Sequence, residues 1–154
     1  MLTDAKLTIA FLLHDIARQM RHAFDLQARD LGVTRQQWRV LLYVARHDGS
    51  TQTELADALD VERISVGRMV DRLVDNGLVE RRADPADRRV WRLHLLPLSH
   101  DIVNKLSAIG ASLEADVLAG IPADKCDELR STLEHIREEV RRVRANLECK
   151  RNVA

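Results

Sequence analysis

Aromatic residues are scarce in this sequence, at 3% of 154 residues, whereas leucine, alanine, valine and arginine are plentiful. That balance favours helices over sheets. No stretch approaches the ~18 consecutive apolar residues of a membrane-spanning helix, and the N-terminus carries no secretory signal pattern. We therefore expect a mainly helical, cytoplasmic protein that has no membrane partner.

Cysteine is rare too, and the chain has only Cys126 and Cys149. Two widely spaced cysteines form neither a disulfide framework nor a zinc knuckle. The histidines show no HExxH motif and no His-x-x-x-His pair, so we expect no metal site and no cofactor. A Gly-rich phosphate loop, a Ser-His-Asp order with an elbow motif and paired carboxylates in a pocket-like context are lacking as well, which argues against an enzyme.

An excess of charge of either sign is also missing, because 24 basic residues balance 24 acidic ones. A surface that binds nucleic acid must then be a local concentration of basic residues. Residues 81–92 are such a concentration, since they hold five arginines and only two aspartates.

Turn signals divide the chain into helical stretches and one hairpin. Examples are Asp48-Gly49, Asn76-Gly77 and Gly120-Ile121-Pro122. Apolar residues recur three or four positions apart between most of these signals, and two short stretches have strand character instead. We expect helices over about 4–30, 34–46, 51–59, 62–76, 99–119 and from 123 onward, with strands at 78–82 and 90–95.

Capping residues mark several helix starts. Thr34 with Gln37, and Thr51 with Glu54, match the capping box, in which the two side chains satisfy each other's backbone N–H groups. The residues expected to cap the first and fifth helices are Asp4 and Ser99.

Each helix from the second to the fifth carries an apolar stripe that should face the core. The expected core residues are Trp38, Leu41, Leu42 and Ala45, then Leu55, Ala58 and Leu59, then Val66, Met69, Val70 and Leu73, then Ile102, Leu106, Ile109, Leu113 and Val117. The last helix differs, because its apolar residues follow the heptad spacing that packs against a partner helix. That seam comprises Leu129, Leu133, Ile136, Val140, Val143 and Leu147.

Two short helices joined by a tight turn, followed at once by a hairpin with a basic tip, make a winged helix-turn-helix. We therefore predict a mainly α fold with a small β-hairpin wing, in which residues 34–97 form a DNA-binding lobe. The recognition helix would span about 62–76 and the wing about 78–96. A helix of this kind fits the major groove of DNA.

The predicted recognition helix has one apolar face and one polar face. Arg68 and Arg72 lie one turn apart on the polar face, where they can reach guanine edges or phosphates, and Ile64 can touch a thymine methyl. Residues 50–53 open the preceding helix, where hydroxyls and N–H groups can hold a phosphate. The candidate DNA-binding residues are Thr51, Gln52, Thr53, Arg63, Ile64, Ser65, Arg68, Arg72, Arg82, Arg88 and Arg89.

The tip of the hairpin, Asp87-Arg88-Arg89, supplies a second contact. An arginine at a wing tip can enter the negatively charged minor groove. Asp87 would not bind DNA itself; we expect it to pair with an arginine and orient it.

The combination of Glu54-Leu55-Ala56, Ser65 with residues 68–73, Asn76-Gly77-Leu78-Val79 and residues 84–89 resembles the MarR family of transcriptional regulators, nearest to its SlyA-like members. The resemblance covers nearly the whole chain. It implies a homodimer whose N- and C-terminal helices interlock, here residues 1–33 and 98–154. It also implies a pseudo-palindromic double-stranded operator, with Arg89 in the minor groove. Where many members have Thr or Ser before the recognition-helix arginine, this chain has Gly67.

The family resemblance also implies an effector. Members often respond to small phenolic or aromatic carboxylates, which typically release a repressor from DNA. The corresponding candidates are Trp38, which resembles a pocket-lining residue, and Arg18, with His14 and His22 on nearly the same helix face. An arginine fork suits a carboxylate and an aromatic wall suits a ring. The competing interpretations are a core tryptophan and a solvated or dimer-facing stripe.

Two other functions remain open from the sequence. A winged helix can be a protein-interaction module, although this would favour exposed apolar residues on the fourth helix and a wing without arginines. A redox-sensing regulator could use Cys126 or Cys149, and Cys126 falls in the first turn of a helix, where a thiolate is favoured.

Overall fold

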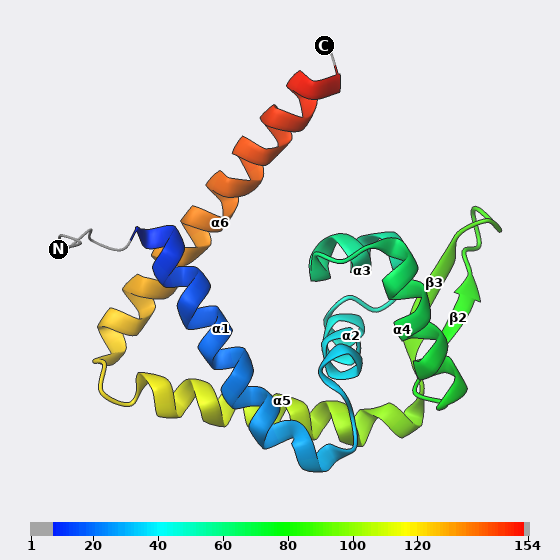
Figure 1. Ribbon diagram of the computed structural model, residues 1–154, viewed down its shortest axis with the longest axis horizontal. Coiled ribbons are helices and arrows are strands. Elements are labelled where there is room, and N and C mark those ends of the chain that lie inside the picture. The colour runs from blue at the N-terminus through cyan, green and yellow to red at the C-terminus, as the bar shows by residue number, and fades with distance from the viewer. Residues whose placement is uncertain (1–7, 153–154) are drawn as a thin grey trace, which may run out of the picture. The chain divides into compact units, whose positions relative to one another are not determined.

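The computed structural model describes residues 8–152 (Figure 1). It divides into two compact units, Met1–Leu113 and Glu114–Ala154. In chain order the elements are α1 (Ile9–Ala28), the short 3-10 helix η1 (Arg29–Leu31), α2 (Arg35–Arg46), β1 (Ser50–Thr51), α3 (Gln52–Leu59), α4 (Arg63–Asp75), β2 (Val79–Ala83), β3 (Trp91–Leu95), α5 (Pro97–Leu118) and α6 (Ala123–Asn152). The predicted order of helices and hairpin is confirmed.

The helix starts follow the capping residues with two exceptions. Both predicted capping boxes are present: Thr34 accepts from the Gln37 N–H at 3.3 Å, and Thr51 accepts from the Glu54 N–H at 3.2 Å. Helix α1 begins at Ile9, because the side chain of Thr8 accepts from the Phe11 N–H. The predicted cap Asp4 lies outside the described residues.

The predicted cap Ser99 is wrong. Helix α5 already begins at Pro97, which suits a first helical position because proline has no N–H to leave unpaired. Ser99 is fully buried in the first turn, and its hydroxyl donates to the Leu96 carbonyl at 2.7 Å.

The main core lies between α2, α3, α4 and the sheet. Leu41, Leu55, Val66, Leu73 and Leu93 are all completely buried there. In α2 and α3 two predicted core residues are wrong: Ala45 and Ala58 are exposed, while Val44 and Ala56 are buried. The rotation of each helix about its axis was therefore slightly misjudged where small residues lie on both sides of the stripe.

A second cluster joins α1, α2 and α5. Ala28, Trp38, Leu42 and Leu106 are buried in it, and Phe24 packs against them. Helix α2 therefore buries two faces, one in each cluster. Val117, the last residue of the predicted α5 stripe, is 50% exposed, so its assignment to the core is wrong.

The sheet has three antiparallel strands in the order β1-β3-β2. The hairpin pairs Val79 with Leu95 at its base and Ala83 with Trp91 toward its tip. The two-residue strand β1, which was not predicted, pairs Ser50 with Leu93 and Thr51 with Arg92. This pairing joins the segment between α2 and α3 to strand β3 of the wing.

Helix α6 forms most of the second unit. Its heptad seam is largely uncovered, with Val140, Val143 and Leu147 between 50% and 60% exposed. Arg130 pairs with Glu114 at 3.2 Å within this unit. Among the described residues no single helix has the length and apolar character of a membrane span; α5 and α6 meet the length and composition criteria only when they are taken together across their bend.

Candidate nucleic-acid interface

Helix α4 presents two distinct faces. Val66, Val70 and Leu73 are completely buried and Met69 is 8% exposed, as predicted. Arg68 and Arg72 are exposed, and Ile64 is 71% exposed at the N-terminal end of the helix. The outward surface therefore offers two cations one turn apart and one apolar side chain, with Arg63 exposed and Ser65 half-buried beside them.

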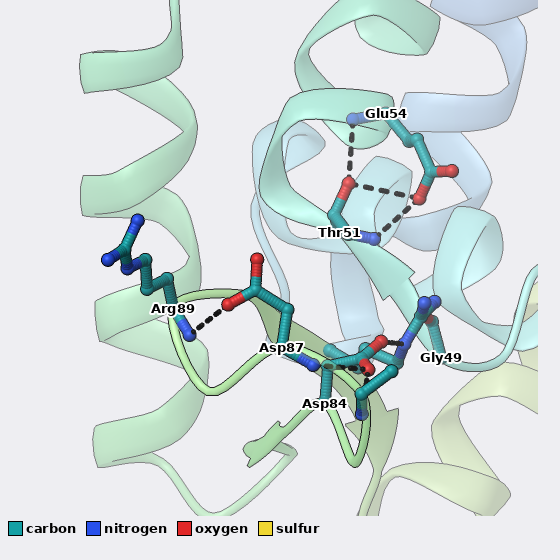
Figure 2. Close-up of polar contacts among 8 residues, drawn as sticks. Gly49, Thr51, Glu54, Asp84, Asp87 and Arg89 are labelled. Atoms are coloured by element: carbon teal, nitrogen blue, oxygen red, sulfur yellow. Dashed lines mark hydrogen bonds and ion pairs between the residues drawn. The ribbon is translucent and has the colours of Figure 1, made fainter.

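The N-terminus of α3 is built around its cap. The Thr51 N–H donates to Glu54 at 2.7 Å, and this bond holds the pKa of the Glu54 carboxyl below its usual range. The Thr51 hydroxyl lies 3.0 Å from the same carboxylate oxygen, so it is already engaged in capping (Figure 2). Thr53 is exposed at this end of the helix.

Arg81 ties the hairpin to both helices of the helix-turn-helix. Its guanidinium donates to Asp71 of α4 at 2.6 Å. With the Gln52 amide oriented so that its carbonyl faces Arg81, that carbonyl accepts from Arg81 Nε at 2.8 Å and Nη2 at 3.0 Å. Gln52 was predicted to touch DNA; its carbonyl is bound to Arg81, which leaves its NH₂ group as the end that can donate to another acceptor.

The base of the wing tip is organised by Asp84, which is 7% exposed. Its carboxylate accepts from the Ala86 N–H at 2.7 Å and the Asp87 N–H at 3.2 Å, and it pairs with Arg92. The Ala86 N–H first, and the Arg92 guanidinium next, hold the pKa of Asp84 below its usual range. Arg92 also donates to the Gly49 carbonyl at 2.8 Å, so the wing is bound to the turn before β1 (Figure 2).

The wing tip itself leaves its arginines available. Asp87 accepts from the backbone N–H of Arg89 at 2.9 Å, so it orients the main chain of Arg89 and not its guanidinium. The Arg89 side chain extends away from the Asp84 network (Figure 2). Within residues 8–152, the guanidinium groups of Arg88 and Arg89 make no ion pair. Arg82 differs, because it pairs with Glu80 of its own strand.

Three residues that organise this surface escaped the sequence analysis as site residues: Arg81, Asp84 and Arg92. The signal for Arg81 and Arg92 was the basic run at 81–92, which did not show that these two arginines point into the protein. Asp84 begins an Asp-Pro pair, which predicts a turn but does not indicate that the carboxylate pairs with an arginine.

Comparison with known proteins identifies this arrangement. A model described as the MarR family matches residues 31–90. The solved transcriptional regulator PA3341 is 34% identical over 87% of this chain and 98% of its own, with a TM-score of 0.79. A mutant MarR from E. coli, solved in complex with operator DNA, is 25% identical over 88% of this chain and 98% of its own, with a TM-score of 0.71.

The chain belongs to the MarR family. It is a DNA-binding transcriptional regulator of a family without enzymatic activity. SlyA is also similar, at 21% identity over 86% of this chain and 93% of its own with a TM-score of 0.74, and this likeness shows a shared fold alone.

The candidate effector residues of this MarR-family chain lie in different surroundings, Trp38 in the core and Arg18 on the exposed face of α1. Trp38 is 8% exposed, packs against Phe24 with ring centroids 4.5 Å apart and donates its indole N–H to Asp25 at 3.0 Å. Burial by itself raises the pKa of Asp25, but hydrogen bonds from Arg35 and Trp38 outweigh it and lower the pKa. Arg18 pairs with Asp15 at 2.7 Å.

A cavity of about 310 Å³ lies beside Trp38. Its other lining residues are Asp25, Ala28, Arg29, Val33 and Arg35. His14, Arg18 and His22 are exposed on α1 and do not line this cavity.

The two cysteines lie far apart. Cys126 is half-buried near the start of α6, where its thiol approaches the Ile121 carbonyl at 3.8 Å, and Cys149 is exposed near the other end. At 1.5 Å per residue they are about 35 Å apart along the helix, so they cannot form a disulfide within one chain. No group of three or more metal-ligating side chains occurs among the described residues.

Proposed function

We propose that this MarR-family regulator binds a pseudo-palindromic operator sequence-specifically as a homodimer, with α4 in the major groove and the wing tip in the minor groove. The observation that carries the proposal is the state of Arg89. Its backbone is held by Asp87, while its guanidinium has no ion-pair partner on the described surface. A held backbone with an unpaired cation suits the negative potential of a narrow minor groove.

The remaining contacts divide by chemistry. Arg68 and Arg72 suit guanine edges, and Ile64 suits a thymine methyl. Residues assigned to phosphates fix the register of the protein on the duplex without reading its sequence. These are Thr51, Gln52, Thr53 and Arg63. Ser65 faces the groove, Arg88 precedes Arg89 at the wing tip, and Arg82 lies on β2 of the wing.

Exposed apolar residues support the homodimer. In α1 they include Ile9, Phe11 and Ile16, which are between 50% and 67% exposed. In α6 the heptad seam is exposed in the same way. Contiguous exposed apolar surface on helices marks an association site, and a two-fold dimer presents two recognition helices to two half-sites.

The test is a titration of the protein against a labelled duplex from the intergenic region upstream of its own gene, at several salt concentrations and with random duplex as competitor. Arg89→Ala should weaken binding and lower the salt slope by about one for each phosphate that the variant no longer neutralises. Arg46→Ala, which removes an exposed arginine in the last turn of α2 that is not among the candidate DNA-binding residues, is the matched control.

If binding proves equally weak on both duplexes and insensitive to Arg89, and if genome-wide selection finds no site, the sequence-specific function is overturned. The interaction-module interpretation would then take its place. One observation speaks against that module now: in α4, which is described in full, Ile64 is the one large apolar residue that is exposed.

We further propose that the protein acts as a repressor that a small aromatic carboxylate releases from DNA. The cavity beside Trp38 supports this, since about 310 Å³ is within the range of small-ligand pockets. Arg29 lines it together with Arg35, which is itself paired with Asp25. Because the indole N–H is already bound to Asp25, a ligand there would meet the ring and not the nitrogen.

Calorimetry with a panel of aromatic acids tests the effector. Arg18→Ala and Arg35→Ala are compared, because the first tests the α1 candidates with His14 and His22 and the second tests the cavity. If none of the acids binds, or if neither variant changes binding, this effector proposal is wrong while DNA binding stands.

A further inference from the structure

Trp91 is an exposed aromatic residue on the wing that none of the contacts above uses. It is the first residue of β3, and it is 50% exposed. Its cross-strand partner is Ala83, whose side chain is a single methyl group. The other tryptophan, Trp38, is buried in the core, whereas half of the Trp91 side chain is open to solvent.

The strand register shows which way Trp91 faces. Side chains alternate along a strand, and residues directly opposite each other in an antiparallel pair share a face. Trp91 therefore shares a face with Leu93, which is completely buried, and with Arg81, the cross-strand partner of Leu93. Because Arg81 bonds to Asp71 of α4 and to Gln52 of α3, this is the face of the hairpin that is directed toward the helix-turn-helix.

Trp91 lies on that face beyond the reach of the core. On this face Arg81 is half-buried and Leu93 is buried, and the next pair toward the tip, Ala83 and Trp91, is exposed. The adjacent residue Arg92 pairs with Thr51, immediately before α3. Trp91 is thus placed between the start of α3 and the arginines of the wing tip.

A sugar–phosphate strand must pass through this place when the regulator binds DNA as proposed above. The major and minor grooves of a duplex are separated by its backbones. A protein that puts a helix into one groove and a wing into the next therefore spans the strand between them. The surface between helix and wing faces deoxyribose and phosphate, not base edges.

We propose that Trp91 packs its indole ring against the deoxyribose of this strand and donates its Nε1–H to a phosphate oxygen. The inference rests on the proposed function, whose wing contact it extends. Tryptophan suits the task because it joins a large apolar surface to one hydrogen-bond donor, and ribose and phosphate offer the matching pair. Arg88 and Arg89 of the wing tip supply the attraction to phosphate, and Trp91 supplies apolar contact.

A backbone contact is independent of sequence, so the test does not require the operator. The probe is a random-sequence duplex of about 30 base pairs, long enough for two half-sites one helical turn apart, in salt of about 50 mM. Trp91→Ala should weaken binding about tenfold, and Trp91→Phe should lose less because it keeps a ring. Leu98→Ala removes another exposed apolar side chain, 71% exposed in the first turn of α5, and should bind as the unaltered protein does.

Tryptophan fluorescence gives a second readout. Addition of duplex should change the emission of the unaltered protein but not that of Trp91→Phe, in which the buried Trp38 is the remaining emitter. Circular dichroism and thermal melting should show that the Trp91 variants remain folded, because the ring is not part of the core.

The outcomes separate this inference from the function on which it rests. If the duplex binds the unaltered protein and Trp91→Ala equally well, and emission does not change, the Trp91 contact is overturned and DNA binding stands. If Arg89→Ala no longer binds the duplex while Trp91→Ala binds it as tightly as the unaltered protein does, the wing contacts the groove without Trp91 and the inference is overturned. No binding to any duplex at low salt would overturn both.

Discussion

Arg92 pairs with the buried carboxylate of Asp84 and also donates to the carbonyl of Gly49, which precedes Arg92 by 43 residues in the sequence. One guanidinium thereby attaches the wing to the turn that precedes β1. The backbone N–H groups of the wing at Ala86 and Asp87 also donate to Asp84. We infer that this ion pair keeps the wing in a binding-ready conformation.

Replacement of Asp84 should therefore loosen the wing. Asp84→Asn keeps an oxygen for the Ala86 N–H but loses the charge that Arg92 needs, so we expect a lower thermal midpoint and weaker DNA binding. Asp48→Asn is the matched control. It alters a carboxylate in the turn before β1 that contacts His94 of β3, and it should leave the wing tip in place. Equal DNA binding by Asp84→Asn and the unaltered protein would contradict this role.

The same pair makes stability depend on pH in a defined direction. The pKa of Asp84 is lowered in the folded state, so the stability that it contributes is fully present above its unfolded pKa of about 3.9 and is lost as the pH falls through the folded value. The difference in free energy of unfolding between the unaltered protein and Asp84→Asn should shrink as the pH falls below about 4. A difference that stays constant on acidification would show that the charge of Asp84 contributes nothing.

Asp87 should affect DNA binding and not stability. Its carboxylate holds the Arg89 N–H, and both residues are exposed at the tip. Asp87→Ala should weaken DNA binding about threefold to tenfold because Arg89 loses its fixed backbone, whereas exposed substitutions of this kind change stability by about 0.5 kcal/mol at most. Asp87→Asn keeps the acceptor oxygen and should restore most of the binding in the same titration.

Thr51 should contribute to stability through its cap. Its hydroxyl accepts from the Glu54 N–H and its own N–H donates to the Glu54 carboxylate. Thr51→Ala should lower the free energy of unfolding by about 1 kcal/mol, measured by urea denaturation. Thr51→Ser keeps the hydroxyl, so a loss as large as that of alanine would show that the methyl group and not the cap is responsible.

Gly67 is a position where a larger residue should stabilise the recognition helix. Helix α4 is regular there, and a Cβ atom would lie 3.9 Å from the Gln52 amide, an ordinary contact distance. Gly67→Ala should raise the free energy of unfolding by about 0.5–1 kcal/mol, because alanine is the better helix former. A decrease would mean that the close approach of α3 and α4 at Gln52 requires glycine.

The exposed seam of α6 should control the oligomeric state. Val143 is 50% exposed on the apolar side of the helix. Val143→Asp places a charge in the proposed dimer interface and should shift sedimentation from dimer to monomer at micromolar concentration. Ser131→Asp adds the same charge off the seam and should leave the dimer intact; a dimer unaffected by both changes would place the interface elsewhere.

The elements of this fold were largely predictable because their signals are local. Capping pairs three residues apart, glycines at Gly49 and Gly77 with positive φ, and apolar residues at helical spacing lie within one or two turns of each other. The buried face of α4 was likewise predicted in full. Several of the errors fell where this signal is weak: β1 is too short to show alternation, and alanines at 45 and 58 carry little apolar weight.

Residue type and local spacing by themselves determined that this protein has a winged helix-turn-helix, where its recognition helix lies and that its wing is basic. They could not determine which of the basic side chains are available to DNA. That was decided by tertiary structure, because Arg81 and Arg92 are bound by Asp71, Gln52, Asp84 and Gly49, whereas Arg88 and Arg89 make no ion pair in the described part of the chain. An arginine has the same charge in either setting, and only the partners that folding brings within hydrogen-bond distance separate a structural guanidinium from one that can bind phosphate.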